Sequence, residues 1–166
     1  KGQEDFIKLI AALRKRGMDA HGLIAGETHP KKREFETELR ALAEELGVAG
    51  DVTFLGHRKD IREVMAVSDL VLSLSRDPEA FGRVSLEAMA LGKPVVAYDH
   101  GGVGEQLRTI FSDGLVPVGD EAAVIAATLG ILDQGKSPSA IDPFTLENML
   151  ASTLGVYESV LAAGRS

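Results

Sequence analysis

The chain has 166 residues, of which 45% are hydrophobic and 26% are charged, and this composition is typical of a single globular domain. It has no Cys, which excludes a disulfide framework, a thiolate zinc site, an iron–sulfur cluster and a Cys nucleophile, and which fits a reducing compartment such as the cytoplasm. The net charge of −7 argues against a general nucleic-acid binder, and no apolar run approaches the roughly 20 residues of a membrane-spanning helix.

Helical patterns alternate with short apolar runs over the first third of the chain. Residues 3–16 carry apolar side chains at helical spacing, and residues 30–46 repeat this pattern from Pro30 up to a glycine that ends the helix. Residues 20–25 and 51–55 are apolar runs that are each followed by a glycine, so we expect buried strands there. We expect no signal peptide, because the opening residues are polar and lead into the first helical pattern.

The same alternation continues to the end of the chain. Asp60 precedes a short helical pattern that runs to residue 67, and we expect its side chain to cap that helix. The remaining strands are expected at 70–74, 94–97 and 115–118, and the remaining helices at 83–91, from the Gly101-Gly102 turn to about 108, at 120–133 and, after a linker at 135–143, at 143–163.

This succession of elements predicts the fold class. Strands that are apolar on both faces and alternate with helices predict a parallel sheet that is covered on both sides. With right-handed crossovers, the result is a Rossmann-like α/β domain of three layers (α/β/α) around a doubly wound sheet. Ligands of such domains bind beyond the carboxyl ends of the strands. Those ends are expected at 26–28, 56–58, 73–82, 98–102 and 119–120.

The segment after the third expected strand carries two glutamates that need a physical account. Glu87 is the only ionisable side chain between Val84 and Leu91, so it needs a partner or costs several kcal/mol if it is buried. Glu79 lies just before Gly82, where the backbone can approach a ligand closely and the free N–H groups of the next helix can bind an anion. Eight residues separate the two glutamates, which suits the two ends of one elongated ligand better than an acid/base pair.

The segment around these glutamates resembles a known family. Glu79 and Glu87 flank a Phe-Gly pair, and Gly-Lys-Pro-Val-Val at 92–96 and Gly-Gly-x-x-Glu at 101–105 follow in order. This arrangement is similar to the C-terminal, nucleotide-sugar-binding domain of retaining glycosyltransferases with the GT-B fold, in the group 1 or glycogen synthase-like family. The resemblance covers nearly the whole chain. It implies the transfer of a sugar from a nucleoside diphosphate sugar to an acceptor, with retention of anomeric configuration.

The resemblance also implies roles for individual residues. Glu79 is implied as the catalytic residue that holds hydroxyls of the transferred sugar, and Glu87 as the partner of the ribose hydroxyls. Lys1, in a Lys-Gly pair, would contact the donor diphosphate, and an ammonium group suits this task. The resemblance further assigns the sugar and diphosphate pocket to Phe81, Gly82 and Arg83, and the base to His57 or Arg58. It implies no metal and no cofactor other than the donor substrate, and the sequence carries no metal-ligand pattern.

The chain also departs from the family pattern. A strand and a Gly-Arg segment that the family places before Lys1 are absent, as is the N-terminal, acceptor-binding domain. Residues 1–166 are therefore expected to form a single donor-binding domain that lacks its first strand and needs the N-terminal domain in cis or in trans. The isolated domain is expected to be inactive and cytoplasmic, or peripheral at the membrane through the full-length protein. A nucleotide-sugar epimerase and a non-catalytic module that retains the fold stay open as alternatives.

Overall fold

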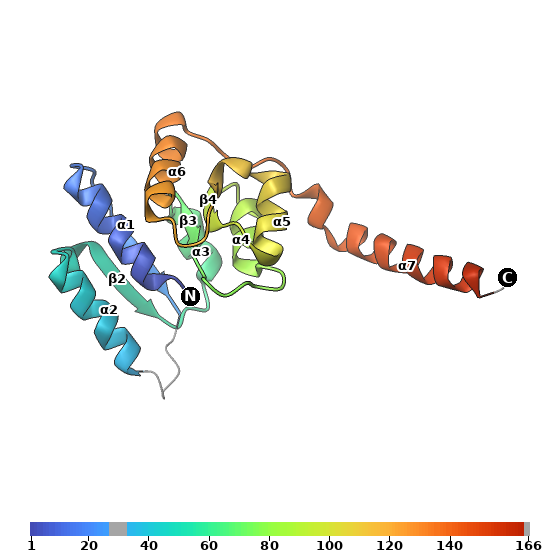
Figure 1. The fold of residues 1–166 in the computed structure, drawn as a ribbon, viewed down its shortest axis with the longest axis horizontal. Coiled ribbons are helices and arrows are strands. Elements are labelled where there is room, and N and C mark those ends of the chain that lie inside the picture. The colour runs from blue at the N-terminus through green and yellow to red at the C-terminus, as the bar shows by residue number, and fades with distance from the viewer. Residues whose placement is uncertain (27–32, 165–166) are drawn as a thin grey trace.

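The computed structural model describes residues 1–26 and 33–164 and shows an α/β domain followed by a projecting helix (Figure 1). The helices are α1 (Gln3–Lys15), α2 (Arg33–Glu45), α3 (Ile61–Val67), α4 (Arg83–Ala90), α5 (Gly101–Ile110), α6 (Glu121–Gln134) and α7 (Leu146–Ala163). The strands are β1 (Gly22–Ala25), β2 (Val52–Gly56), β3 (Val71–Ser73), β4 (Val95–Tyr98) and β5 (Leu115–Val116). Short 3-10 turns are formed by η2 (Ala49–Asp51), η3 (Ser112–Gly114) and η4 (Asp142–Phe144).

The expected helices and strands are all present, with shifts of a few residues at their ends, whereas the three 3-10 turns were not expected. Pro30, expected near the start of the second helix, lies outside the described residues. The expectation that the Asp60 side chain caps α3 is wrong. Its carboxylate instead accepts a hydrogen bond from Arg58 Nε at 2.8 Å, because the guanidinium two residues earlier offers a stronger, charged donor.

The strands are parallel, as expected, but they form two separate sheets in the part of the chain that the structure describes. One sheet pairs β1 with β2, and the other has the order β3-β4-β5. Helix α1 packs on α2 and α6, whereas α4 packs on α3 and α5, so the two groups of helices cover opposite faces (Figure 1). The expected α/β/α class is therefore confirmed, and the single continuous sheet is replaced by two.

Each sheet has its own hydrophobic core, and α1 contributes to both. Leu9 and Leu13 of α1 belong to the larger core around β4, in which every residue of the strand is almost fully buried. Ile7 and Ile10 belong to the smaller core under β1 and β2. The alternation of apolar residues along one amphipathic helix thus connects the two sheets.

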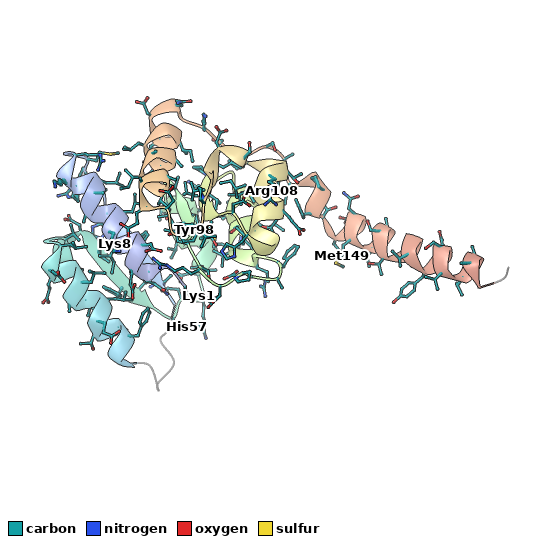
Figure 2. All side chains as sticks on the ribbon, in the orientation of Figure 1. Lys1, Lys8, His57, Tyr98, Arg108 and Met149 are labelled. Carbon is teal, nitrogen blue, oxygen red and sulfur yellow. The ribbon has the colours of Figure 1, made fainter. Side chains whose placement is uncertain are left out.

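Helix α7 projects from the domain, and its apolar side chains are exposed (Figures 1 and 2). It begins at Thr145, whose hydroxyl accepts a hydrogen bond from the Asn148 N–H at 3.3 Å. The exposed apolar residues along it are Leu146, Met149, Leu150, Leu154, Val156, Tyr157, Val160 and Leu161. None of the helices in the described ranges is both long enough and apolar enough to span a bilayer.

Candidate functional site

The loop that carries Glu79 is held against the first turns of α5. The Gly102 N–H donates to the Glu79 carbonyl at 2.9 Å, and the Gln106 side-chain amide donates to the Phe81 carbonyl. A Cβ atom on Gly102 would lie 2.4 Å from the Ala80 oxygen, and one on Gly101 would lie 2.5 Å from the Glu79 oxygen. The glycine pair is therefore required for the close approach of two backbones, which fixes where Glu79 stands.

Gly82 fulfils a packing role at the amino end of α4. Its φ is +80°, and a Cβ atom there would lie 2.3 Å from Val103 Cγ2. A glycine is thus needed here for contact with α5 as well as for the left-handed backbone. The side chains on either side of it, Phe81 and Arg83, both point into solvent.

Lys1 and Glu79 are brought together although 78 residues separate them. Lys1 Nζ lies 2.7 Å from Glu79 Oε1, and the lysine side chain is 71% exposed while that of the glutamate is 29% exposed. Gly2, in a left-handed conformation, lies directly against the Leu74 backbone just beyond β3, and this places Lys1 at the carboxyl end of that strand. The ammonium and the carboxylate therefore sit where a ligand of a parallel α/β domain binds.

Glu87 lies on the partly exposed face of α4. Its side chain is 42% exposed, and one oxygen lies 3.5 Å from an Arg83 guanidinium nitrogen one turn earlier. The inward positions of the helix are taken by Ser85, Ala88 and Met89. The expected desolvation cost at Glu87 is therefore small, because water reaches the carboxylate. Both glutamates belong to the segment that leads into α4 and continues through it. Only Glu79 contacts Lys1.

His57 and Arg58 follow β2 and are both exposed. Together with Lys1 and Gly2 they line the mouth of a large cleft that runs between the two sheets. Arg58 is held by its bond to Asp60, and this pairing raises the pKa of Arg58 and lowers that of Asp60. The structure thus brings His57, Arg58 and Lys1 to one cleft. The other expected site residues do not line it: Glu79, Phe81, Gly82, Arg83 and Glu87.

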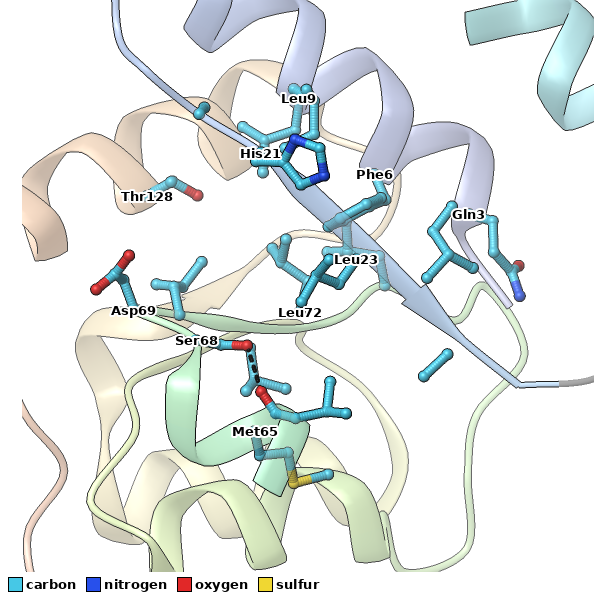
Figure 3. A pocket seen from close by; sticks show the side chains of 18 of the residues that line it. Gln3, Phe6, Leu9, His21, Leu23, Met65, Ser68, Asp69, Leu72 and Thr128 are labelled. Atoms are coloured by element: carbon cyan, nitrogen blue, oxygen red, sulfur yellow. Dashed lines mark hydrogen bonds between the residues drawn. The ribbon is translucent and has the colours of Figure 1, made fainter. Parts of the chain in front are cut away.

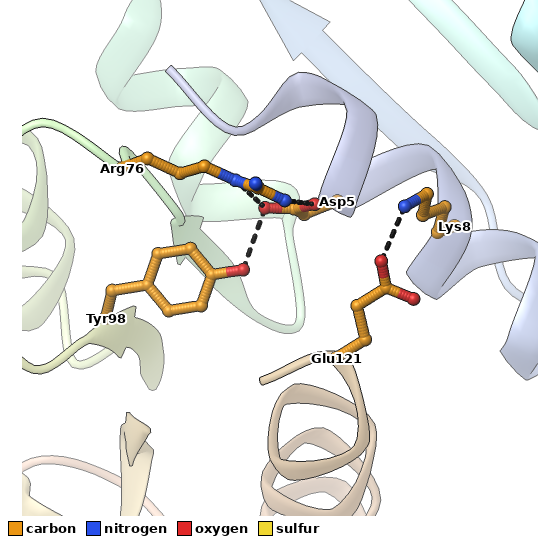
Figure 4. Close-up of polar contacts among 5 residues, drawn as sticks. All are labelled: Asp5, Lys8, Arg76, Tyr98 and Glu121. Atoms are coloured by element: carbon orange, nitrogen blue, oxygen red, sulfur yellow. Dashed lines mark hydrogen bonds and ion pairs between the residues drawn. The ribbon is translucent and has the colours of Figure 1, made fainter. Parts of the chain in front are cut away.

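A cluster of polar contacts around the buried carboxylate of Asp5 was not expected from the sequence (Figure 4). Asp5, at 4% exposure, accepts hydrogen bonds from Arg76 at 2.8 and 3.2 Å and from the Tyr98 hydroxyl at 2.8 Å. Burial raises the pKa of Asp5, but the bonds from Arg76 and Tyr98 outweigh it and leave that pKa below its usual value. Burial and the bond to Asp5 raise the pKa of Tyr98 to about 12.

This cluster fixes the amino end of α1 to the larger sheet. Asp5 comes from α1, Arg76 from the loop after β3, and Tyr98 from the end of β4. One signal in the sequence points to this cluster: Asp5 stands beside the apolar stripe of a helix. A carboxylate that is buried there needs a charged or hydrogen-bonding partner. Among the described residues, no group of three His, Asp or Glu side chains could hold a metal ion.

This chain is similar to known proteins over most of its length. The model of the family described as glycosyl transferases group 1 matches residues 1–144. N-acetyl-alpha-D-glucosaminyl L-malate synthase of Bacillus anthracis is 38% identical over 94% of this chain and 40% of its own length. Phosphatidyl-myo-inositol mannosyltransferase of Mycolicibacterium smegmatis is 34% identical over 99% of this chain and 43% of its own length.

A solved structure extends the similarity to the fold. The crystal structure of Alr3699/HepE from Anabaena in complex with UDP is 27% identical, with a TM-score of 0.76, over 98% of this chain and 45% of that one. The chain thus spans less than half the length of each of these three proteins.

Proposed function

Because the chain belongs to the group 1 glycosyltransferases, we propose that it is the donor-binding domain of an enzyme that transfers a sugar from a nucleoside diphosphate sugar, with retention of anomeric configuration. The observation that carries this proposal is the contact of Lys1 with Glu79 at the carboxyl end of β3. In this contact an ammonium group, which can bind phosphate, lies next to a carboxylate, which can accept hydrogen bonds from hydroxyls. A donor with a diphosphate beside a sugar needs these two groups at adjacent positions.

The ion pair between Lys1 and Glu79 implies an order of events when the donor binds. An exposed ion pair contributes about 0–1 kcal/mol, so an arriving diphosphate can take over the Lys1 ammonium at little cost. Glu79 is then free to accept hydrogen bonds from hydroxyls of the transferred sugar. The N–H groups of the first turn of α4, behind Gly82, add a second source of positive potential for the leaving diphosphate.

Glu87 and the residues after β2 complete the proposed donor site. Glu87 is exposed to solvent and is available to accept hydrogen bonds from the two ribose hydroxyls. His57 and Arg58 lie at the mouth of the same cleft as Lys1 and would contact the base. UDP is the first nucleotide to test, because the similar Anabaena protein was crystallised with it.

Calorimetric titration with UDP, GDP and ADP tests this assignment. We expect saturable binding of one nucleotide, and the Glu87→Ala variant should bind it at least about tenfold more weakly, because a charge-assisted hydrogen bond is worth about 1.5–3 kcal/mol. Glu44→Ala, which removes an exposed carboxylate on α2, is the matched control and should bind as the wild type does. Equal affinity of the Glu87→Ala variant and the wild type would contradict the proposal that Glu87 binds the ribose hydroxyls.

The role of Glu79 is tested by comparing a nucleoside diphosphate with its sugar conjugate. Glu79→Ala should weaken binding of the nucleotide sugar more than that of the bare diphosphate, because its carboxylate faces the sugar. An equal loss for both ligands would contradict this division. With the complete enzyme, an epimer of the donor sugar as product would favour an epimerase, and no turnover at all would favour a non-catalytic module.

We assign α7 to the contact with the other half of the enzyme. Its apolar residues are exposed, and the relatives have more than twice the length that this chain covers. The acceptor-binding domain, in cis or in trans, would bury this surface. The double substitution Leu154→Ser and Val160→Ser should leave nucleotide binding by this chain unchanged and lower transfer by the complete enzyme. Clear sugar transfer by residues 1–166 alone would contradict the need for that domain.

A further inference from the structure

The loop between β3 and α4 is held through its backbone carbonyls by the first half of α5 and by the residue before that helix. The Ser75 carbonyl lies 2.8 Å from His100 Nε2, and this nitrogen has to carry the proton, because a carbonyl only accepts. The Gly102 N–H donates to the Glu79 carbonyl at 2.9 Å. The loop is thus fixed near its start and again at Glu79.

Gln106 provides a third contact, from one turn further along α5. Its side-chain N–H group donates to the Phe81 carbonyl. Only Ala80 separates Glu79 from Phe81, so two carbonyls on either side of one residue are bonded to the same helix. The bond also fixes the plane of the peptide group between Phe81 and Gly82, because that group is rigid and planar. A rotation of the backbone after Glu79 would therefore break one of the two bonds to α5.

Packing alone does not account for a glutamine at this position. Gln106 is 1% exposed, and the other buried side chains of α5 are apolar: Val103, Leu107 and Ile110. Because the Phe81 carbonyl only accepts, the side-chain N–H group has to face it, and Gln106 Oε1 is left buried without a partner among the described residues. An apolar side chain of similar size would avoid the cost of that oxygen. The hydrogen bond to the loop is thus what the polar side chain adds here.

The loop that Gln106 holds carries the carboxylate of the candidate site. Glu79 is 29% exposed and contacts the Lys1 ammonium at 2.7 Å, whereas the Gln106 side chain is almost fully buried. A buried side chain of this kind does not touch a ligand itself. An effect of Gln106 on ligand binding therefore has to pass through the loop and through Glu79.

We infer that Gln106 is a positioning residue of the donor site: by holding the Phe81 carbonyl it fixes the position of Glu79, and it thereby favours a nucleoside diphosphate sugar over the bare diphosphate. The inference rests on the proposed function, since it requires that Glu79 binds the transferred sugar. The hold on the loop does not depend on a ligand, so the two can be tested separately.

Two variants remove the bond in opposite ways. Gln106→Met keeps the length of the side chain but has no N–H group, and Gln106→Asn keeps the N–H group but is shorter by a methylene group. Thr128→Val is the matched control, because it removes a hydroxyl that is 1% exposed and that also lacks a partner among the described residues. Figure 3 shows Thr128 at the end of the cleft remote from Gln3, and so remote from the amino end of α1.

Amide exchange tests the hold on the loop without a ligand. In both Gln106 variants we expect the Gly102 amide to exchange at least about tenfold faster, because the Glu79 carbonyl to which it donates is held less tightly. The Phe111 amide, which donates to the Leu107 carbonyl at the end of α5, should change less than about twofold if the helix is intact. An unchanged Gly102 amide, or equal acceleration of both amides, would overturn the inference.

Calorimetric titration tests the effect on the site. The probes are UDP-glucose, GDP-mannose and ADP-glucose, each compared with its bare nucleoside diphosphate. Both Gln106 variants should bind the nucleotide sugar that the wild type binds at least about tenfold more weakly, with a smaller loss for the bare diphosphate, and Thr128→Val should bind both as the wild type does. Equal losses for the two ligands, or no loss, would overturn the inference.

A double-mutant cycle with Glu79→Ala shows whether Gln106 acts through Glu79. In the Glu79→Ala background, Gln106→Met should weaken binding of the nucleotide sugar by less than about threefold, because the carboxylate that it positions is gone. A loss as large as in the wild-type background would overturn the inference. A wild type that binds none of the probes would instead contradict the proposed function, and the exchange of the Gly102 amide would still decide whether Gln106 holds the loop.

Discussion

The two sheets of this domain differ in the size of their hydrophobic cores and in the residues that they contribute to the candidate site. The β3-β4-β5 sheet has the larger core, and the loops after β3 and β4 carry Glu79 and the glycines that hold it. The β1-β2 sheet rests on the smaller core and, among the described residues, supplies His57 and Arg58 to the candidate site. The two glutamates therefore belong to the half with the larger core, whereas the half with the smaller core contributes His57 and Arg58.

Helix α1 is the link between these halves, because it packs in both cores and its Asp5 is bonded to the loop after β3 and to β4. A movement of one half relative to the other would therefore disturb the contacts of α1. Substitutions in each core and along α1 can show whether the halves unfold together.

The largest effects are expected from cavities in the two cores. Leu107→Ala in the larger core should lower the free energy of unfolding by about 2–5 kcal/mol and speed amide exchange in both sheets. Leu39→Ala, at a similarly buried site in the smaller core, should speed exchange at Leu23 and Ile24 and leave Val96 almost unchanged, because the β1-β2 half can open locally. Equal acceleration at all these amides in both variants would mean that the two halves form one cooperative unit.

The next effect concerns the cluster that fixes α1. Tyr98→Phe removes one donor from the buried Asp5 carboxylate and should cost about 1.5–3 kcal/mol at neutral pH, measured by urea unfolding. Tyr157→Phe on α7 removes a hydroxyl from an exposed side chain, and it should change stability by less than about 0.5 kcal/mol. A loss of equal size in both variants would exclude a specific role for the Tyr98 hydroxyl.

The pH dependence of the same cluster has a definite sign. The folded protein raises the pKa of Tyr98 to about 12, against about 10 in an unfolded chain, so the stabilisation is present below pH 10 and is lost as the pH rises toward 12. The difference between the wild type and Tyr98→Phe should therefore shrink over that interval. Asp5 has a lowered pKa, so its contribution is present above about pH 4 and is lost as the pH falls through its folded pKa.

A smaller cost in stability, with a distinct cost in binding, is expected at the glycine pair. Gly102→Ala forces the Glu79 loop away from α5, which should cost about 1–3 kcal/mol and weaken nucleotide-sugar binding at least about tenfold. Gly130→Ala is the matched control, because this glycine lies in α6 with nothing within 4 Å of an added Cβ atom, and it should be neutral or stabilising by up to about 1 kcal/mol. If the Gly102→Ala variant binds the nucleotide sugar as the wild type does, the contact between Gly102 and the Glu79 loop is not needed for binding.

The order of elements could be predicted from the sequence, and so could the strand ends at which the candidate site lies. Periodicity and glycine stops are local signals, so α1, α4 and α6 begin and end within one residue of their expected bounds. The expected positions of the carboxyl ends of the strands also follow from the topology. They include Glu79, the partner of Lys1.

Two features could not be predicted, because they depend on contacts between residues far apart in the chain. Asp5 reaches Arg76 and Tyr98 across 71 and 93 residues, and nothing near Asp5 in the sequence indicates those partners. The division into two sheets likewise depends on which strands pair with each other. The sequence of one strand does not show which strand it pairs with. Glycines 101 and 102 were recognised as a turn, but their contact with the Glu79 loop is visible only in three dimensions.

The smallest effect is expected at the other ion pair of α1. Lys8 Nζ lies 2.5 Å from Glu121 Oε1 of α6, and both side chains are close to half exposed (Figure 4). Because water screens this pair, Lys8→Met should cost about 0–1 kcal/mol, and the difference from the wild type should fall further as salt is raised to 1 M. Asp5→Asn, one turn earlier on the same helix, should cost more and keep more of its effect in salt, because the Asp5 carboxylate and its partner Tyr98 are buried, although Arg76 is exposed. Equal costs in the free energy of unfolding and an equal response to salt would mean that the contacts of Asp5 fix α1 no more strongly than the Lys8–Glu121 ion pair does. The larger sheet would then not be the half that positions the amino end of α1.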